Sequence, residues 1–539
     1  MMKKINILLL AMLCLTTAWA QDFTLVSTPE AVNELNYSHW DEALGQDETG
    51  FYTIGKLNTS ISNQQIYLKK FSPSLNLLFT KNIPASFGTF NDSKTYLGTE
   101  MANGQIFVFY RGWDKNERQV SIHVKMLNPE TGNLSNDFVL LESEFSKSQM
   151  NSANFVYSFS PDGSKMLVLT EKPFEKKQSE EVRLQVFNTA DFSSLWKKDL
   201  VLKDEYKRGR SNSIAVNNNG ISYIFKEFIE SSTERKYSLV TTNAVSSSTT
   251  PITFNEYIIG ETNIFIDEEG NLNVGAILSD QPKFFSVSVG SESNWQGLWL
   301  FKAGEDGNVM ANTTYALTSP ELQALTANAK RESIPGKNIF KLKDVIKDAS
   351  NGTVFLIEHT AEKRNAIPNS SPIAYEYNLT HKGIYAIAFD ENNAYRWNQV
   401  LNKNQVEMTL DPKLYYGSFT HTFVNDKLYL FWNYMEVRYE SGSGYRYWIN
   451  ENNQMINIDH LYGKEALHPT LMTVIDNQGN FEYGNRAFQS LPLHSIQMGN
   501  FVAMAMNPAL SFGIQNGIIL ISQMPGGPAL RYKLSQVNF

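Results

Sequence analysis

The sequence predicts an all-β fold made of repeated four-stranded units, and three observations support this prediction. Aromatic residues make up 12% of the chain and charged residues only 19%, a composition typical of β-rich proteins. A short turn, usually ending in Gly, precedes an apolar strand at eight places. The first four steps between these turns average 55 residues. Repetition of one turn type at this spacing predicts the blades of a β-propeller, with separate β-sandwich domains as the alternative.

The clearest unit covers residues 155–202. It contains four predicted strands, Phe155–Ser160, Met166–Thr170, Val182–Asn188 and Leu195–Leu202. The turn Pro161-Asp162-Gly163 joins the first two, because Asp-Gly and Asn-Gly pairs supply the positive φ that tight hairpins need. The centre of this unit, FSPDGSKMLVL, resembles a blade of the TolB-like and WD40-like propeller families. This resemblance implies a fold and no activity.

Variants of the same turn divide the chain into eight units. The turns are Asp47-Glu48-Thr49-Gly50, Ala102-Asn103-Gly104, Pro161-Asp162-Gly163, Asn218-Asn219-Gly220, Glu268-Glu269-Gly270, Ser350-Asn351-Gly352, Val424-Asn425-Asp426 and Gln515-Asn516-Gly517. The last three steps lengthen to 82, 74 and 91 residues. Units five to seven are therefore expected to carry long insertions.

The insertions are expected to leave from one rim of the ring. A helix is predicted over Ser319–Lys330, with Ser319 as N-cap and Pro320 at the first helical position, after the fourth strand of unit five. Long loops are predicted near 279–296, 360–382 and 435–466, between second and third strands. In an antiparallel four-stranded blade, these two kinds of connection leave from the same edge.

The last unit is expected to be completed by the start of the chain. Its strands are predicted within 501–512, 518–522 and 530–537, and a fourth is missing. The extended segment Phe23–Ser27 is predicted to add to it as the outer strand, which would cover an open edge. We therefore predict one ring of eight blades, with seven as the alternative.

The N-terminus predicts export. Lys3 and Lys4 precede an apolar run, and Ala18-Trp19-Ala20 forms a cleavage site, so residues 1–20 are predicted to be a signal peptide and 21–539 the propeller. No later apolar run is long enough to span a membrane. Leu13 stands before Cys14 where a lipoprotein has Gly or Ala, so a periplasmic or secreted protein is expected. With Gln21 at the cleavage point and no cysteine after the signal peptide, the chain resembles exported proteins of Bacteroidota.

Cysteine content and net charge exclude two classes of function. Cys14 is the only cysteine, so the mature domain is expected to have no disulfide and no cysteine-based site. Loss of Lys3 and Lys4 with the leader changes the formal charge from −8 to −10. Such an acidic protein is not expected to bind nucleic acid.

Two aromatic insertions are the candidate binding surface. The unit-seven insertion contains Tyr434, Tyr439, Tyr445, Tyr447 and Trp448, and the unit-five insertion contains Phe284, Phe285 and Trp295. Such rings offer large contact areas to a protein partner in the cell envelope, or stack on a glycan. The alternative is a hairpin extension whose rings pack on one another across two strands.

No catalytic, metal or cofactor site is predicted. The Asp-rich turns at Asp267, Asp390 and Asp476 lack the alternating ligands of a calcium loop and are predicted to be hairpin turns. No GxSxG motif is present, and no pair of carboxylates is assignable to glycoside hydrolysis. The sequence therefore favours a non-catalytic binding or scaffolding protein.

Overall fold

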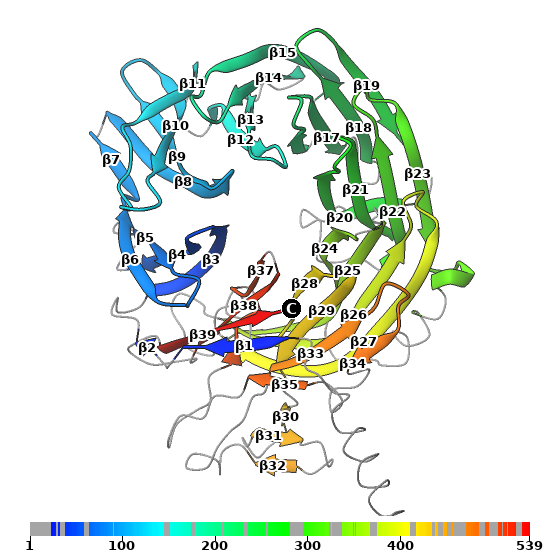
Figure 1. Cartoon of the computed structure of the whole chain (residues 1–539). Helices are drawn as coiled ribbons and strands as arrows, with labels where there is room; N and C mark the ends of the chain where they lie inside the picture. Colours follow the sequence, from blue (N-terminus) through cyan, green and yellow to red (C-terminus); the bar gives the residue numbers. More distant parts are fainter. Residues whose placement is uncertain are drawn as a thin grey trace, which may run out of the picture.

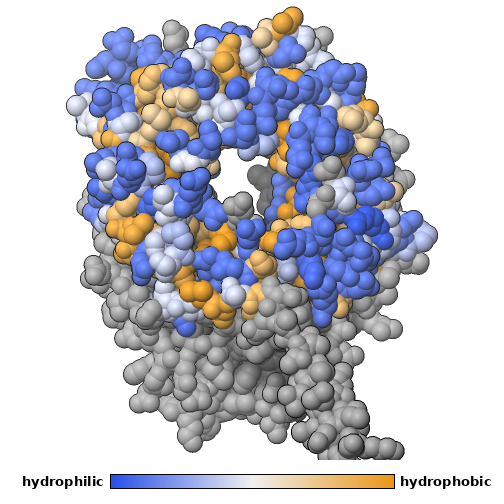
Figure 2. Space-filling model, viewed as in Figure 1, coloured by the Kyte–Doolittle hydropathy of each residue, from blue (hydrophilic) through white to orange (hydrophobic). Residues whose placement is uncertain are grey.

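The computed structural model describes residues 23–28, 31–32, 38–58, 64–89, 91–144, 151–173, 178–205, 210–229, 235–254, 257–280, 295–322, 325, 337–348, 350, 352–366, 375–409, 417–433, 437–439, 446–449, 455–457, 470–483, 491–494, 505–508, 510–514, 516–523 and 531–539. Within them the chain forms eight antiparallel sheets in a ring around a central channel (Figures 1 and 2). The molecule is an eight-bladed β-propeller. The predicted signal peptide lies outside the described residues.

Blades one to four follow chain order from the inner to the outer strand. Blade one contains β3 (Ser38–Asp47), β4 (Gly50–Asn58), β5 (Gln64–Phe71) and β6 (Leu77–Ile83). Blade two contains β8 (Asp92–Ala102), β9 (Gln105–Asp114), β10 (Gln119–Leu127) and β11 (Phe138–Glu144), with β7 (Ser86–Gly88) along β8. Blade three contains β12 (Asn154–Phe159), β13 (Lys165–Glu171), β14 (Ser179–Asn188) and β15 (Ser194–Glu205). Blade four contains β16 (Arg210–Val216), β17 (Ser222–Ile229), β18 (Arg235–Thr242) and β19 (Ser247–Ile252).

Blades five and six keep this order, and blades seven and eight have divided strands. Blade five contains β20 (Tyr257–Ile266), β21 (Leu272–Asp280), β22 (Trp295–Ala303) and β23 (Val309–Ala316). Blade six contains β24 (Lys337–Lys347), β25 (Thr353–Ala366), β26 (Tyr375–Phe389) and β27 (Tyr395–Thr409). Blade seven contains β28 (Thr420–Val424), β29 (Lys427–Asn433) and β33 (Thr470–Ile475), with β34 (Phe481–Tyr483) and β35 (Leu491–His494) both along β33. Blade eight contains β36 (Ala505–Met506) and β37 (Phe512–Ile514) along β38 (Gly517–Gln523), then β39 (Arg531–Asn538), with β1 (Thr24–Ser27) and β2 (Ala31–Val32) along β39.

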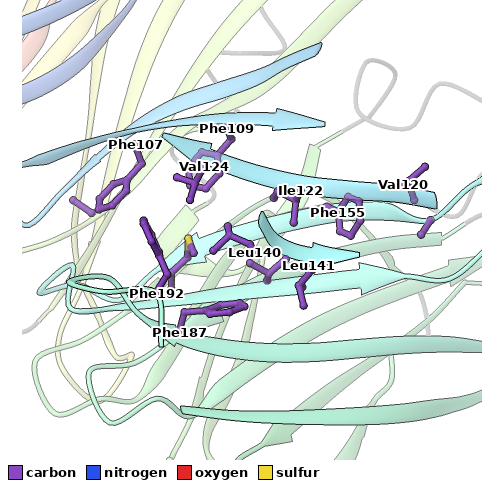
Figure 3. Packing of buried hydrophobic residues seen from close by; sticks show 14 residues of the cluster. Phe107, Phe109, Val120, Ile122, Val124, Leu140, Leu141, Phe155, Phe187 and Phe192 are labelled. Atoms are coloured by element: carbon purple, nitrogen blue, oxygen red, sulfur yellow. The ribbon is translucent and has the colours of Figure 1, made fainter. Parts of the chain in front are cut away.

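The middle strands are apolar on both faces because each blade is covered by two neighbours. In β13, Met166 and Val168 pack toward blade two, whereas Leu167 and Leu169 pack toward blade four. Figure 3 shows the cluster between blades two and three that the first pair helps to form. Fully burying side chains of this size contributes ~1.5–3 kcal/mol each. Burial on both sides explains why these strands are continuous apolar runs. All four predicted strands of this blade are confirmed.

All eight predicted turns join the first strand of a blade to the second. Asn103 and Gly104 have φ angles of 47° and 67°, and Asn425 and Asp426 have 50° and 61°. Both turns therefore have positive φ at their two central positions, as a tight hairpin requires. A Cβ on Gly163 would lie 2.4 Å from the backbone N of Asn103, so glycine lets the turns of blades two and three approach each other.

The Asp-rich turns are hairpin turns, as predicted. Asp267, Asp390 and Asp476 each accept the backbone N–H four residues later, at 2.8, 2.8 and 2.7 Å. Burial raises the pKa values of Asp267 and Asp476, but the hydrogen bonds that these carboxylates accept hold both pKa values below the ordinary value. These carboxylates stabilise the turns.

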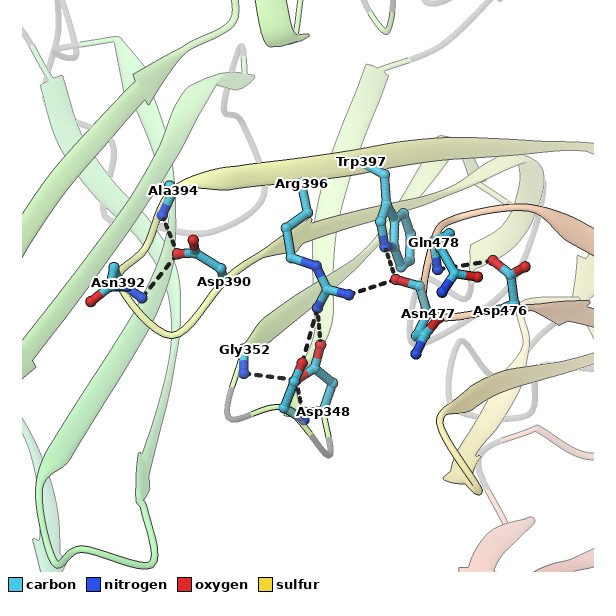
Figure 4. Close-up of polar contacts among 11 residues, drawn as sticks. Asp348, Gly352, Asp390, Asn392, Ala394, Arg396, Trp397, Asp476, Asn477 and Gln478 are labelled. Atoms are coloured by element: carbon cyan, nitrogen blue, oxygen red, sulfur yellow. Dashed lines mark hydrogen bonds and ion pairs between the residues drawn. The ribbon is translucent and has the colours of Figure 1, made fainter.

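Side chains at this turn rim also link neighbouring blades (Figure 4). Arg396 on β27 donates from Nη1 to Asp348 in its own blade, and from Nη2 to the carbonyl of Asn477 at 2.6 Å. Trp397 Nε1 donates to the same carbonyl at 3.0 Å. The outer strand of blade six therefore holds the β33–β34 turn of blade seven.

The N-terminal strand completes blade eight, as predicted. β1 pairs with β39 from Thr24↔Asn538 to Ser27↔Ser535. The hydroxyls of Ser27 and Ser535 lie 2.8 Å apart, and the backbone N of Thr28 donates to the carbonyl of Leu534 at 2.9 Å. Both ends of the chain therefore meet in one sheet.

Two insertions contain more regular structure than the predicted loops. β25 and β26 continue as paired strands out to Ala366↔Tyr375, so the loop expected near 360–382 is largely a hairpin. Its backbone groups extend the ladder of the blade, which satisfies their hydrogen bonds. Between β29 and β33, β30 (Val437–Tyr439), β31 (Arg446–Ile449) and β32 (Met455–Asn457) form a separate sheet. Of the unit-five insertion, residues 281–294 lie outside the described part.

The predicted helix is present from Pro320. Residues 320–322 and 325 are helical, and Leu322 and Leu325 are buried. The carbonyl of Ser319 accepts the N–H of Leu322 at 3.1 Å. The Ser319 hydroxyl, expected to cap the helix, makes no hydrogen bond with the described residues. The backbone turn, rather than the predicted side-chain cap, begins this helix.

Deleting residues 21–28 should lower the melting temperature by about 5 °C or more, because each lost backbone hydrogen bond contributes about 1 kcal/mol and β39 becomes an open edge. Differential scanning calorimetry measures this. The control is Leu25→Thr, which keeps the backbone ladder at a 40% exposed position and should change little. An unchanged melting temperature in the deletion variant would contradict strand closure.

Gly479→Ala should destabilise the fold by about 2–4 kcal/mol. Gly479 has φ of +86°, and a Cβ there would lie 2.6 Å from the Trp397 ring. Gly104→Ala is the matched control, since Gly104 has φ of +67° and nothing within 4 Å of the added carbon. It should cost about 1 kcal/mol for the backbone conformation alone. If denaturant unfolding gave the same loss of unfolding free energy for Gly479→Ala and Gly104→Ala, the Trp397 contact would contribute nothing to the cost.

Candidate functional site

The predicted aromatic residues of unit seven that the structure describes lie on a small sheet. Tyr439 is in β30, and Tyr447 and Trp448 are in β31. Tyr439 pairs with Arg446, and Trp448 pairs with Val437 and Ile456. Each of these aromatic positions is thus opposite a non-aromatic residue.

The other candidates divide into two groups. Tyr434, Tyr445, Phe284 and Phe285 lie outside the described residues. Trp295 is the first residue of β22, and the residue is only 5% exposed.

Trp295 packs between blades five and six. Its ring centroid is 5.1 Å from that of Phe340 and 5.6 Å from that of Tyr385, and its Nε1 donates to the carbonyl of Gly297 at 2.9 Å. This tryptophan belongs to the core and does not contribute to an exposed loop surface. Sequence spacing had placed it in an insertion because β22 begins earlier than expected.

A polar site that the sequence did not indicate lies on the inner strands β20, β24 and β28, which we call the channel wall (Figure 1). β20 and β24 each contain a bulge, between Ile259 and Thr262 and between Leu342 and Asp344. The Leu342 amide, at the second bulge, donates to Glu261 at 2.5 Å. Bulges redirect side chains and are frequent beside functional sites. Burial raises the pKa of Glu261.

Asp344 joins all three strands of the channel wall. Its carboxylate accepts from Asn263 Nδ2 of β20 at 2.6 Å, and His421 Nε2 of β28 lies at 3.0 Å. Burial would raise the pKa of Asp344, but the hydrogen bond and charge of His421 hold this pKa below the ordinary value. An ionised carboxylate only accepts, so Nε2 of His421 carries the proton. The strands of blades five, six and seven are therefore linked at one carboxylate.

Behind the channel wall lies a buried ionic network. Glu358 on β25 is 1% exposed. It accepts from Lys403 at 2.7 Å and from Ser418 at 2.7 Å, and His381 Nδ1 lies at 3.1 Å. Burial would raise the pKa of Glu358, but the charge of Lys403 and the hydrogen bond from His381 hold it well below the ordinary value. Burial lowers the pKa of His381 despite Glu358, so this ring is neutral at pH 7.

The network continues into blades seven and eight. Lys403 also donates to Gln405 at 2.8 Å, and Gln405 Nε2 donates to the carbonyl of Asn433 at 2.6 Å. Asn433 Nδ2 in turn donates to the carbonyl of Met506 at 2.6 Å. These bonds link blades six, seven and eight.

A second network of this kind joins blades three and four. Glu180 and Lys226, both 2% exposed, form an ion pair, and Asn212 donates to Glu180 and to Glu171 at 3.0 and 2.6 Å. Blades three and four lack long insertions, so a buried ion pair alone indicates a structural role. What distinguishes blades five to seven is the combination of network, channel wall and insertions.

Within the described residues, no group of three or more His, Cys, Asp or Glu side chains is placed to hold a metal ion. No helix in that same part of the chain has the length and apolar character needed to cross a bilayer.

Comparisons with known proteins show likeness of fold only. No protein-family model matches the chain, and no curated protein matches it. Among solved structures, the Dos1 propeller is 9% identical over 95% of both chains, with a TM-score of 0.38. The propeller domain of the trilobed protease from Pyrococcus furiosus is 9% identical over 70% of this chain and 99% of its own, with a TM-score of 0.33. Prolyl oligopeptidase B from Galerina marginata is 11% identical over 74% of this chain and 55% of its own, with a TM-score of 0.32.

Glu358→Gln should lower the free energy of unfolding at pH 7 by about 3 kcal/mol, because it leaves the Lys403 ammonium buried without its counter-ion. Glu358→Gln with Lys403→Met should restore much of this loss. The pKa of Glu358 is depressed in the fold, so its contribution is present above the ordinary value of 4.5 and disappears as the pH falls through the folded value. The deficit of the single variant should therefore shrink in acid.

Denaturant unfolding at pH 7 and at a series of pH values that descends below 4.5 measures these differences. The control is Glu181→Gln, which removes a surface pair with Lys172 and should cost less than about 1 kcal/mol. A single variant as stable as the wild type at pH 7 would show that the pair contributes little.

Proposed function

We propose that the protein is a non-catalytic, extracytoplasmic binding propeller that holds a protein partner on the insertion face of blades five to seven. The insertion face is the rim formed by the second-to-third and fourth-to-first connections of these blades. The observation that carries the proposal is that the helix from Pro320, the β25–β26 hairpin and the β30–β32 sheet all leave from this rim. β30 also lies against β27, so the additions of blades six and seven are neighbours.

The size of this face favours a protein partner over a small ligand. A specific protein–protein interface buries about 800 Å² on each side, which needs a surface wider than one blade edge. The networks of Glu358 and Asn433 link blades six, seven and eight through buried hydrogen bonds, and a surface that is held in place before binding loses less entropy on binding. Loops and hairpins on a rigid scaffold are a frequent arrangement for recognition.

The proposed location outside the cytoplasm rests on the N-terminal sequence. Lys3 and Lys4, the apolar run after them and the Ala18-Trp19-Ala20 site have the form of a signal peptide. A periplasmic partner is therefore proposed. Glycan binding by Tyr447 and Trp448 remains the competing proposal.

Replacing residues 434–469 by Asn-Gly should abolish partner binding while the propeller stays folded. Asn433 and Thr470 are directly paired across β29 and β33, so a two-residue turn closes the blade. The matched control replaces residues 230–234 by Asn-Gly between the paired residues Ile229 and Arg235, on the same rim of blade four. Partners are captured by mild crosslinking and affinity purification from native envelopes, and melting curves verify folding.

Loss of the captured protein in the first variant and its retention in the control support the proposal. Capture of the same protein by both variants, or a wild-type chain that runs alone after crosslinking, overturns it. A glycan-array signal that disappears in Trp448→Ala, without any captured protein, supports the carbohydrate alternative instead.

A further inference from the structure

A serine, a histidine and an aspartate are aligned on the side of blade two that faces blade one. Ser121 and His123 are alternate residues of β10, on the face opposite the core residues Val120 and Ile122. Ser121 Oγ lies 2.7 Å from His123 Nε2, and His123 Nδ1 lies 2.8 Å from Asp137 Oδ2. The imidazole is therefore held between a hydroxyl and a carboxylate.

These two hydrogen bonds define where the protons lie. A carboxylate accepts, so Nδ1 of His123 carries the ring proton and donates to Asp137. Nε2 then has a lone pair, and the Ser121 hydroxyl donates to it. His123 is 4% exposed, so the surrounding blade holds the ring in this orientation. A serine that donates to a histidine, which is itself oriented by a third group, is the arrangement that activates a serine as a nucleophile.

Gly112 on β9 makes room for this arrangement. It pairs directly with Ser121, and a Cβ there would overlap Ser121 Oγ and lie 2.6 Å from His123 Nε2. The hydroxyl and the ring therefore occupy space that the side chain of any other residue would fill. Ser121 is the third residue of β10 after the β9–β10 connection, and it is partly exposed. The hydroxyl thus lies close to the edge of the blade.

The same face of blade two contains a buried hydrogen-bond donor that the fold does not use. Tyr110 pairs directly with His123, is fully buried, and makes no hydrogen bond through its hydroxyl within the described residues. Burial raises the pKa of Tyr110, and the charge of Asp137 adds to this effect, so the hydroxyl keeps its proton. Buried donors in native proteins nearly always have a partner, so this one favours a bound molecule beside β9 and β10.

We propose that Ser121 is an activated nucleophile that accepts an acyl group from an activated ester, with His123 as the base and Asp137 as a positioning residue. Ser121 Oγ forms a bond to the acyl carbon, its proton passes to His123 Nε2, and the bond from the acyl carbon to the leaving oxygen breaks. The proton then passes from His123 to that leaving oxygen. The chain ends as the Ser121 ester, so this is one modification of the protein and not a turnover. It goes beyond the proposed function and does not depend on it.

The test is covalent labelling of the purified, folded protein with a fluorophosphonate and, separately, with p-nitrophenyl acetate. The fluorophosphonate undergoes the same attack, with phosphorus in place of the acyl carbon and fluoride as the leaving group. Mass spectrometry of peptides should place one adduct of each reagent on Ser121, and none on the same protein unfolded in urea. The matched control is Ser193→Ala, which removes an exposed serine that donates to Asp191 instead of a histidine, and it should leave labelling unchanged.

Three variants separate an activated serine from a serine that only stabilises the blade. His123→Gln should slow labelling about a hundredfold, since a positioned general base contributes at least this much. Asp137→Asn should slow it at least about tenfold and Asp137→Glu less, because a carboxylate still orients the ring. Gly112→Ala should slow labelling as much as His123→Gln although the three side chains remain, because its Cβ displaces the hydroxyl and the ring. Melting curves verify folding, and Asp137→Asn, at a side chain 28% exposed, is the test if the other variants do not fold.

Three outcomes overturn the inference: no adduct on Ser121 with excess reagent, labelling of Ser193 as fast as that of Ser121, or an adduct whose rate the folded variants of His123 and Asp137 do not change. The labelling assay does not involve blades five to seven. Failure here therefore leaves partner capture by the insertion face standing, and failure of partner capture leaves the Ser121 nucleophile standing.

Discussion

A four-stranded sheet that is apolar on both faces is stable only between two other sheets, and this constraint governs the whole ring. In β29, Leu428, Leu430 and Trp432 pack toward blade six, while Tyr429 and Phe431 pack toward blade eight. Any blade at an open end would expose one of these faces to water. Closure of the ring removes both ends. The ring is closed by backbone hydrogen bonds between the N-terminal strand β1 and the C-terminal strand β39 in blade eight.

The two rims of the ring are stabilised by different interactions. At the turn rim, strands reverse within a few residues, and Asp and Asn side chains satisfy the turn backbone while Arg396 and Trp397 reach the next blade. At the opposite rim, the apolar core ends and polar side chains are buried between blades. Glu358 with Lys403, and Glu180 with Lys226, satisfy one another there, which is the condition for burying charge.

This difference explains where additional polypeptide is accommodated. The turn rim has little space, since Gly163 and Gly479 already touch backbone or ring atoms of neighbouring blades. At the insertion rim, β25 and β26 simply continue their ladder outward, so added residues satisfy their own hydrogen bonds. Additional polypeptide is therefore accommodated at the insertion rim and excluded from the turn rim.

The repeat and the blade number could be predicted from sequence, because strands and turns depend on neighbouring residues. The closing strand pairs residues more than 500 positions apart, and it was predictable only because the last unit lacks a fourth strand of its own. The alternation and length of strands such as Met166–Thr170, and the positive φ demanded at Asn103-Gly104, are local properties. The Glu358 carboxylate inside the apolar run of β25 was a visible signal of a buried network, but its partner was not identifiable.

Only the tertiary structure decided the channel wall and the place of Trp295. Asp344 and His421 are 77 residues apart and Glu358 and Lys403 are 45 apart, so nothing in local sequence pairs them. Trp295 follows a segment whose composition is that of an exposed aromatic loop. Only the packing of β22 against Phe340 and Tyr385 buries it. Local patterns specify strands and turns because their energies come from adjacent residues, whereas side-chain pairs form where closure of the ring brings distant strands together.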